Sequence, residues 1–337
     1  MKKLTYLLFS AILFVSCNQK EDLRVDKHSF SEPHNIRTTH LDLAVTVDFE
    51  TEVISGKAKY TLENLVGSKE LILDANGLRI DQVLSAGLEC TYRLGENDSI
   101  LGQALIIDLE KEATEVTIYY QSAPNAKALQ WLNPKQTAGK KQPFLFTQSQ
   151  AILARTWLPC QDSPGVRFSY NATVTVPAGL MAVMSAENPT KKTSDGVYHF
   201  KMKQAIPAYL MALGVGNLEF KSLGAHTGIY AEPEMIAKAA YEFAETENML
   251  KIAEKMYGKY AWERYDMLLL PPSFPFGGME NPRLTFVTPT ILAGDRSLTA
   301  LIAHELAHSW SGNLVTNKTW DDFWLNEGFT VYFERRI

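Results

Sequence analysis

His304-Glu305-Leu306-Ala307-His308 is the stretch that decides the fold of the C-terminal part of this chain. The apolar spacing around it predicts a helix that Asp295 or Ser297 caps and that runs through Trp310. Residues i and i+4 of a helix share one face, so the two imidazoles can converge on one tetrahedral Zn²⁺. Glu305 stands beside the first imidazole and is the candidate general base toward a water molecule.

A third metal ligand is expected at Glu327, which follows His308 by 327 − 308 = 19 positions. It lies near the start of a last predicted helix, which begins near Asp322 and is still running at Ile337. We therefore expect the chain to be part of a longer protein. Two imidazoles and one carboxylate leave a fourth position on Zn²⁺ free, which is typical of a catalytic site and indicates a hydrolase.

Glu334 follows Glu327 by seven positions, on the same face of the predicted helix. It is a candidate to orient a metal-bound imidazole through a hydrogen bond. A surface salt bridge is an equally good interpretation of this residue.

Upstream, Gly277-Gly278-Met279-Glu280-Asn281 follows a short apolar strand and a Pro-rich turn. Glycines allow a bound chain to approach the backbone closely, and their N–H groups can pair with an extended peptide. The carboxylate of Glu280 can bind the free α-ammonium of a peptide, which confines cleavage to the first residue. Alone, the pentapeptide also fits an ordinary turn beside a surface glutamate, but together with the metal ligands it favours an exopeptidase.

The N-terminal half shows an alternation of period two that is typical of half-buried strands. Apolar and polar residues alternate from Leu41 to Phe49. Further strands are predicted at residues 57–62, 70–73, 105–109, 115–120, 170–176 and 198–203. This pattern predicts an all-β domain over residues 28–221.

The composition changes in residues 222–337. Pro233–Tyr257 has apolar residues at helical spacing and predicts one amphipathic helix. Met267–Leu270 and Leu284–Val287 are predicted short strands. The fold class is therefore α+β with two domains, an all-β domain followed by a catalytic domain that is incomplete in this chain.

Charge and cysteine content exclude several classes of protein. Of the 337 residues, 33 are Lys or Arg and 38 are Asp or Glu, so the net charge of −5 gives no footprint for nucleic acid. Three cysteines cannot form a disulfide scaffold.

Residues 1–17 resemble a bacterial lipoprotein signal peptide. Lys2 and Lys3 precede a short apolar run that ends at Val15, and Ser16-Cys17 follows. We expect export and a lipid anchor on Cys17 that holds the protein at a bacterial membrane, on the periplasmic or cell-surface side. An ordinary cleaved signal with an incidental cysteine is the alternative.

The metal-site residues and the 277–281 segment together resemble the gluzincin aminopeptidases, the family of aminopeptidase N. Further matching segments are Ala128–Leu132, Thr147–Ala151, Leu158–Asp162 and Asn313–Trp320. These segments are similar to the branch that contains leukotriene A-4 hydrolase. The resemblance implies a saddle-like β domain followed by a thermolysin-like zinc domain, with peptides that have a free N-terminus as substrates.

The resemblance also implies roles for individual residues. Gln150, with Gln148 nearby, would join Glu280 in holding the substrate N-terminus, and Trp320 and Phe323 would line the side-chain pocket; core packing is the alternative for both aromatic residues. Two positions depart from the family pattern, Phe276 in place of a tyrosine and Ser149 in place of a cysteine. The catalytic tyrosine, the basic residues for the substrate carboxylate and a helical domain are expected beyond Ile337. The 337-residue chain by itself is therefore expected to have little activity.

Three hypotheses about function follow. The first is an exported zinc aminopeptidase that acts on short peptides. The second is an additional epoxide hydrolase activity on a lipid, which the resemblance permits and no residue demands. The third is a non-catalytic, zinc-containing peptide-binding protein.

Overall fold

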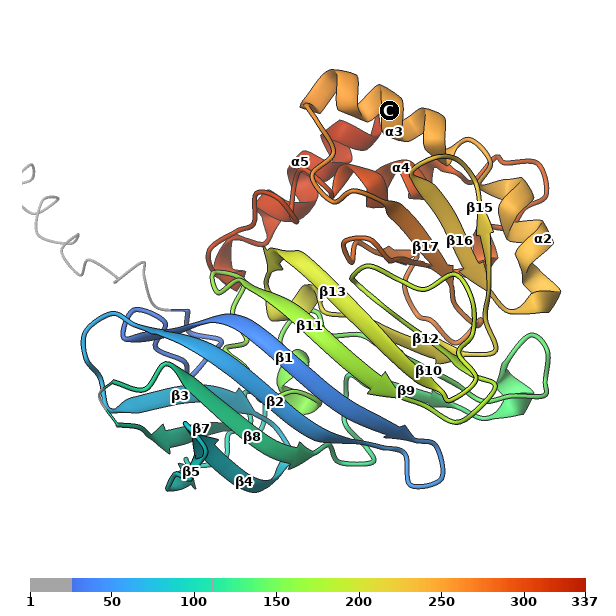
Figure 1. Cartoon of the computed structure of the whole chain (residues 1–337). Helices are drawn as coiled ribbons and strands as arrows, with labels where there is room; N and C mark the ends of the chain where they lie inside the picture. Colours follow the sequence, from blue (N-terminus) through green and yellow to red (C-terminus); the bar gives the residue numbers. More distant parts are fainter. Residues whose placement is uncertain (1–25, 111) are drawn as a thin grey trace, which may run out of the picture.

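The computed structural model describes residues 26–110 and 112–337. They form a β-rich N-terminal part, blue to yellow-green in Figure 1, and a mixed C-terminal part, yellow to red. The predicted signal peptide and Cys17 lie outside the described residues. None of the helices within these ranges is long and apolar enough to cross a lipid bilayer.

The largest sheet has seven strands in the order β13-β11-β1-β2-β8-β4-β5. In that order the strands are Val197–Ile206, Phe168–Thr175, Ile36–Asp48, Val53–Asn64, Glu115–Gln121, Arg79–Ser85 and Leu88–Glu89. Along β1 the alternation predicted from the sequence is confirmed, because Leu41, Leu43 and Val45 are buried and the residues between them are not. β1 runs parallel to β11 and antiparallel to β2.

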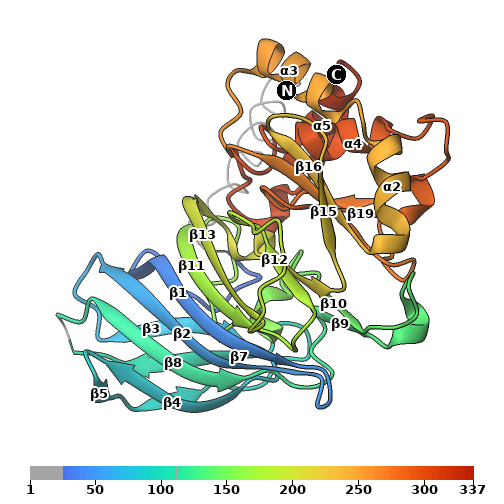
Figure 2. The same cartoon turned by 45° about the vertical axis from the view of Figure 1, so that its right-hand side comes forward.

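Two smaller sheets complete the β-rich part. One has three strands in the order β3-β7-β6, which are Glu70–Ala75, Gln103–Asp108 and Tyr92–Leu94. The other has the order β12-β14-β10-β9, which are Met181–Met184, Leu213–Gly216, Phe144–Thr147 and Leu129–Leu132. Strands β9, β10 and β12 of this second sheet lie between the seven-stranded sheet and the C-terminal part in both views (Figures 1 and 2).

The C-terminal part is built on a five-stranded sheet with the order β15-β16-β17-β19-β18. These strands are Glu219–Ser222, Thr227–Ala231, Tyr265–Leu269, Thr285–Val287 and Gly278–Met279. β15 pairs with β16, so the boundary between the two parts lies before Glu219 and not between residues 221 and 222 as predicted. The short β18 is an edge strand, and one of its sides is therefore unpaired within the sheet.

Four α-helices accompany this sheet, and short 3₁₀ turns connect several elements. The α-helices are α2 Pro233–Glu242, α3 Thr246–Tyr257, α4 Ala300–Ala307 and α5 Trp324–Glu334. The 3₁₀ turns are η1 Pro134–Gln136, η2 Ala154–Thr156, η3 Ala208–Leu210, η4 Pro289–Ile291 and η5 Trp320–Asp322. Helices α4 and α5 are in contact; His304 lies in α4, His308 directly follows α4, and Glu327 lies in α5.

Four predicted helix limits were wrong, and one of them is the end of α4, which lies at Ala307 and not at Trp310. The single helix over Pro233–Tyr257 is two helices, because the chain turns at residues 243–245 and the buried carboxylate of Glu242 binds the backbone N–H groups of Gly294 and Arg296. α4 begins at Ala300, since the carboxylate of Asp295 accepts from Ser297 N in a separate turn. α5 ends at Glu334, after which bonds of the i to i+3 type follow.

Candidate metal centre and active site

Helix α4 brings the two imidazoles together. Ile302 and Leu306 bury one face of the helix, which leaves the histidines on the face toward a cleft. His304 lies within α4 and His308 is the residue that caps its C-terminus. Their Nε2 atoms are 3.1 Å apart, so both nitrogens point at a common position.

Glu327, in the first turn of α5, supplies the third donor, an oxygen. Its Oε2 lies 3.4 Å from Nε2 of His304 and 3.8 Å from Nε2 of His308. Ligands at the usual 2.0–2.1 Å from Zn²⁺ in a tetrahedral arrangement are about 3.3 Å from one another. The three observed separations of 3.1, 3.4 and 3.8 Å scatter around this value, so the donor set fits Zn²⁺.

Hydrogen bonds on the far side of each ring fix its orientation. Oε2 of Glu334 lies 2.5 Å from Nδ1 of His304, while its Oε1 pairs with the exposed Arg335 at 3.1 Å. The carboxylate of Glu334 therefore takes part in both interactions that the sequence left open. Nδ1 of His308 lies 3.1 Å from the carbonyl oxygen of Ser311 and 3.1 Å from the hydroxyl of Thr330. Such contacts set the tautomer that presents Nε2 to a metal.

Burial and neighbouring charges shift the titration of these groups. Burial raises the pKa of Glu305 well above its ordinary value, and the negative charge of Glu280 adds to the effect. Burial lowers the pKa of His304, but the hydrogen bond to Glu327 and the charge of Glu305 outweigh it and raise the pKa to about 9. The hydrogen bond from His304 lowers the pKa of Glu327.

The edge strand β18 packs directly on Glu305. A Cβ atom at Gly278 would lie 2.2 Å from Oε1 of Glu305, closer than real Cβ atoms come to other atoms, so any side chain here would displace the carboxylate of Glu305. The strand leads into Glu280, whose side chain is buried. Gln150 Nε2 and Asn326 Nδ2 each lie 3.5 Å from Oε1 of Glu280. The amide of Asn313 donates to the backbone carbonyl of Glu280 at 2.7 Å.

These residues line one cleft of about 490 Å³. The structure brings together there the predicted residues Gln148, Gln150, Gly277, Gly278, Met279, Glu280, His304, Glu305, His308, Glu327 and Glu334, together with Phe276, Ala300 and Leu301. Trp320 and Phe323 are not among the lining residues. The ring of Trp320 packs on Tyr209 with centroids 5.0 Å apart and on Phe323 at 5.6 Å.

The sequence reasoning missed several residues that hold this site. Asn326 and Thr330 are both buried, and their i, i+4 spacing on α5 is a helical-face pattern that could have identified them. Asn313 and Arg167 carry no such pattern, because their contacts join segments far apart in the chain.

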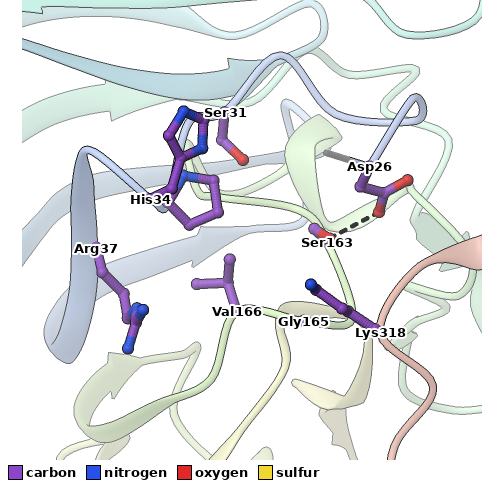
Figure 3. Close-up of a pocket in the computed structure, with 9 residues that line it drawn as sticks. Asp26, Ser31, His34, Arg37, Ser163, Gly165, Val166 and Lys318 are labelled. Atoms are coloured by element: carbon purple, nitrogen blue, oxygen red, sulfur yellow. Dashed lines mark hydrogen bonds between the residues drawn. The ribbon is translucent and has the colours of Figure 1, made fainter. Parts of the chain in front are cut away.

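A second cavity, of about 230 Å³, lies at the junction of the two parts (Figure 3). Asp26, His34, Arg37, Ser163 and Val166 of the β-rich part line it with Lys318 of the C-terminal part, and the hydroxyl of Ser163 donates to Asp26 at 2.7 Å. It shares no lining residue with the metal cleft.

A β-rich domain, a mixed domain with two histidines and one glutamate, and a buried carboxylate beside them define the class of gluzincin-type zinc peptidases. Residues 37–210 match the Peptidase M1 N-terminal domain, and residues 241–337 match the Peptidase family M1 domain. The chain belongs to peptidase family M1, whose members are zinc-dependent. The resemblance and the fold class predicted from the sequence are both confirmed.

Similar proteins place the chain near the leukotriene A-4 hydrolase branch. It is 50% identical to leukotriene A-4 hydrolase of Xenopus laevis over 323 residues, which are 93% of this chain and 53% of the frog protein. It is 43% identical to leucine aminopeptidase 2 of Yarrowia lipolytica, with coverage of 95% and 50%. The chain spans about half the length of the curated relatives it matches.

Solved structures agree with this assignment. The structure of native yeast LTA4 hydrolase superimposes with a TM-score of 0.89 at 39% identity, covering 94% of this chain and 51% of that one. An M1 zinc metallopeptidase from Deinococcus radiodurans superimposes with a TM-score of 0.74 at 26% identity, with coverage of 92% and 72%.

Proposed function

We propose that this protein is a zinc-dependent aminopeptidase that releases the first residue of short peptides with a free N-terminus. One observation carries the proposal. Single donor atoms of Glu280, Glu305 and His308 all lie within 4.8 Å of one another. The nitrogen and carbonyl carbon of one residue are two bonds apart, on the order of 2.5 Å. An ammonium held at Glu280 therefore presents the carbonyl of the same residue to the metal-binding histidines.

Different residues of this chain bind the substrate and transfer the proton. Glu280, with Gln150 beside it, binds the ammonium, and the free side of β18 offers backbone N–H groups to an extended substrate. Bound Zn²⁺ would supply Lewis acidity at the scissile carbonyl. Glu305 accepts a proton from the attacking water and delivers it to the leaving amine. Its burial and its contact with Gly278 hold the carboxylate in one position.

Free and blocked substrates test this function in the full-length natural protein. We expect release of leucine from leucyl arylamide and from leucyl dipeptides, and none from the N-acetylated forms. Glu305→Gln should lower kcat by about 10²–10⁴-fold, which is the usual contribution of a general base. Equal cleavage of blocked peptides would indicate an endopeptidase, and zinc and peptide binding without turnover would favour the non-catalytic alternative.

Two further proposals concern export with a lipid anchor and a second catalytic activity. The N-terminal charges, the apolar run and Ser16-Cys17 support our proposal of export and a lipid anchor. Cys17→Ser should move the protein from the membrane fraction to the aqueous fraction, and unchanged membrane association would contradict the anchor. An additional epoxide hydrolase activity draws its support from the name of the frog relative.

A further inference from the structure

Arg167, directly before β11, is a partly buried cation that crosses from the β-rich part to the C-terminal part. Its Nε donates to the carbonyl of Ala205 at 3.1 Å, Nη1 to the hydroxyl of Thr316 at 2.5 Å and Nη2 to the carbonyl of Asn313 at 2.8 Å. No ion pair joins it to a carboxylate within residues 26–110 and 112–337. Burial lowers its pKa. Neutral acceptors alone therefore fix this side chain, and two of the three belong to the loop between α4 and η5.

Asn313 in that loop connects two parts of the active site to Arg167. Its backbone N–H donates to the carbonyl of the metal ligand His308 at 3.0 Å, and its side-chain amide donates to the carbonyl of Glu280 at 2.7 Å. Its own carbonyl is the acceptor for Arg167. Asn313 is buried, so each of these bonds is shielded from water. A shift of this residue would therefore move Glu280 relative to His308.

The loop around Asn313 is stiff. Thr316 donates its hydroxyl hydrogen to the carbonyl of Gly312 at 2.6 Å, and the N–H of Gly312 donates to Val315. Gly312 has φ +112°, and a Cβ atom there would lie 2.3 Å from Oδ1 of Asn326. The loop therefore moves as a unit, and its position depends on what anchors it from outside.

The junction beside Arg167 is not filled by side chains. Val166, which precedes Arg167, and Lys318, which follows Thr316 by two positions, both line the cavity of about 230 Å³ in Figure 3. Close packing would otherwise fix the loop against the β-rich part. With a cavity there, two contacts hold the loop against the β-rich part: the hydrogen bonds of Arg167 and the close approach of Gly165 to the carbonyl of Lys318.

We propose that Arg167 and Asn313 are positioning residues that set the separation between the ammonium-binding carboxylate of Glu280 and the metal-binding imidazole of His308. The β-rich part thus contributes to the selection of the first peptide bond. This inference rests on the proposed function, because the distance between Glu280 and His308 matters for catalysis only if the protein is an aminopeptidase.

Two hydroxamates test the inference in the zinc-loaded, full-length natural protein. Leucine hydroxamate carries the α-amine, and 4-methylpentanohydroxamic acid is the same metal-binding molecule without it. The dissociation constant of 4-methylpentanohydroxamic acid divided by that of leucine hydroxamate measures amine recognition alone. A loss of folded protein affects both constants equally and cancels in this ratio. We expect Arg167→Met to reduce this ratio by about tenfold, the effect of losing a buried polar contact, through weaker binding of leucine hydroxamate only. Arg167→Lys keeps the positive charge but loses the planar guanidinium that donates to several acceptors at once, so it should give an intermediate ratio.

Arg264→Met is the matched control. Arg264 also joins a backbone carbonyl, that of Ala225, and it pairs with Asp266 away from the loop. Its removal should lower stability and leave the ratio unchanged. An unchanged ratio in Arg167→Met would overturn the inference. If Arg167→Met fails to fold, unchanged ratios in Arg167→Lys and Asn313→Ser would overturn it instead. A parent protein with no preference for the amine would instead overturn the proposed function.

Discussion

Replacing Gly278 with alanine should remove most of the catalytic rate and leave the metal site intact. The new Cβ atom would lie 2.2 Å from Oε1 and 2.6 Å from Cγ of Glu305. Ordinary contact begins at 3.4 Å, so the carboxylate must move by 3.4 − 2.2 = 1.2 Å. Glu305 is 4% exposed, and the space open to it is the cleft that it lines, so the displaced carboxylate would leave its position beside β18.

The size of the effect follows from that displacement. A misplacement of about 1 Å in a reacting group costs on the order of 10²-fold in rate. We therefore expect kcat to fall by about 100-fold, within the 10²–10⁴-fold that a general base contributes. KM and zinc content should stay at the parent values, because the three atoms nearest to the new methyl group all belong to Glu305 and none belongs to a metal ligand.

Gly277→Ala is the control at the adjacent position. Its Cβ atom would meet Cδ1 of Leu301 at 3.0 Å, and this flexible side chain can rotate away. Neither glycine has a positive φ, so alanine strains neither backbone. Kinetics on leucyl arylamide, with zinc measured by mass spectrometry, compare the two variants. A Gly278→Ala variant with the parent kcat, or one that loses zinc together with rate, would refute the reasoning.

The remaining predictions concern the metal and the core. Glu334→Gln should weaken Zn²⁺ binding by about 10–100-fold, because the carboxylate orients His304, and competition with a chelator measures it; unchanged affinity would leave only the salt bridge with Arg335. Arg155→Met should cost about 3–5 kcal/mol of unfolding free energy in a denaturant titration, because it leaves the buried carboxylates of Asp74 and Asp162 without their cation. The exposed pair of Arg79 and Asp81 is the control, and Arg79→Met should cost about 1 kcal/mol or less.

In the β-rich part, the strands that the sequence predicted are those with one face toward solvent. β1 alternates between buried and exposed residues, and its hydrophobic pattern is therefore visible in the sequence. β10, β12 and β14 are buried on both faces and show no alternation. Their assignment depends on the neighbouring sheets, which a local pattern does not contain.

Helix limits fail for a related reason. Apolar spacing of about 3.6 residues continues across residues 243–245, although α2 and α3 are separate helices. The break is fixed by distant partners, since Gly294 and Arg296 bind the carboxylate of Glu242. The metal ligands could be predicted because helical spacing and residue type identify them. Arg167 could not, because its role depends on a contact with Thr316, 149 positions away.

Charge balance explains why this cleft should select an amino terminus. Four carboxylates line it, those of Glu280, Glu305, Glu327 and Glu334, and no lysine or arginine within the described ranges does. A divalent cation at the histidines supplies two positive charges, and a substrate ammonium supplies a third. Glu280 is 4% exposed, so its charge is costly to leave without a partner. Losing one partner of a buried, hydrogen-bonded charge pair costs about 2–5 kcal/mol. Acetylation of the substrate amine should therefore cost more binding free energy than the loss of any single apolar contact in the cleft.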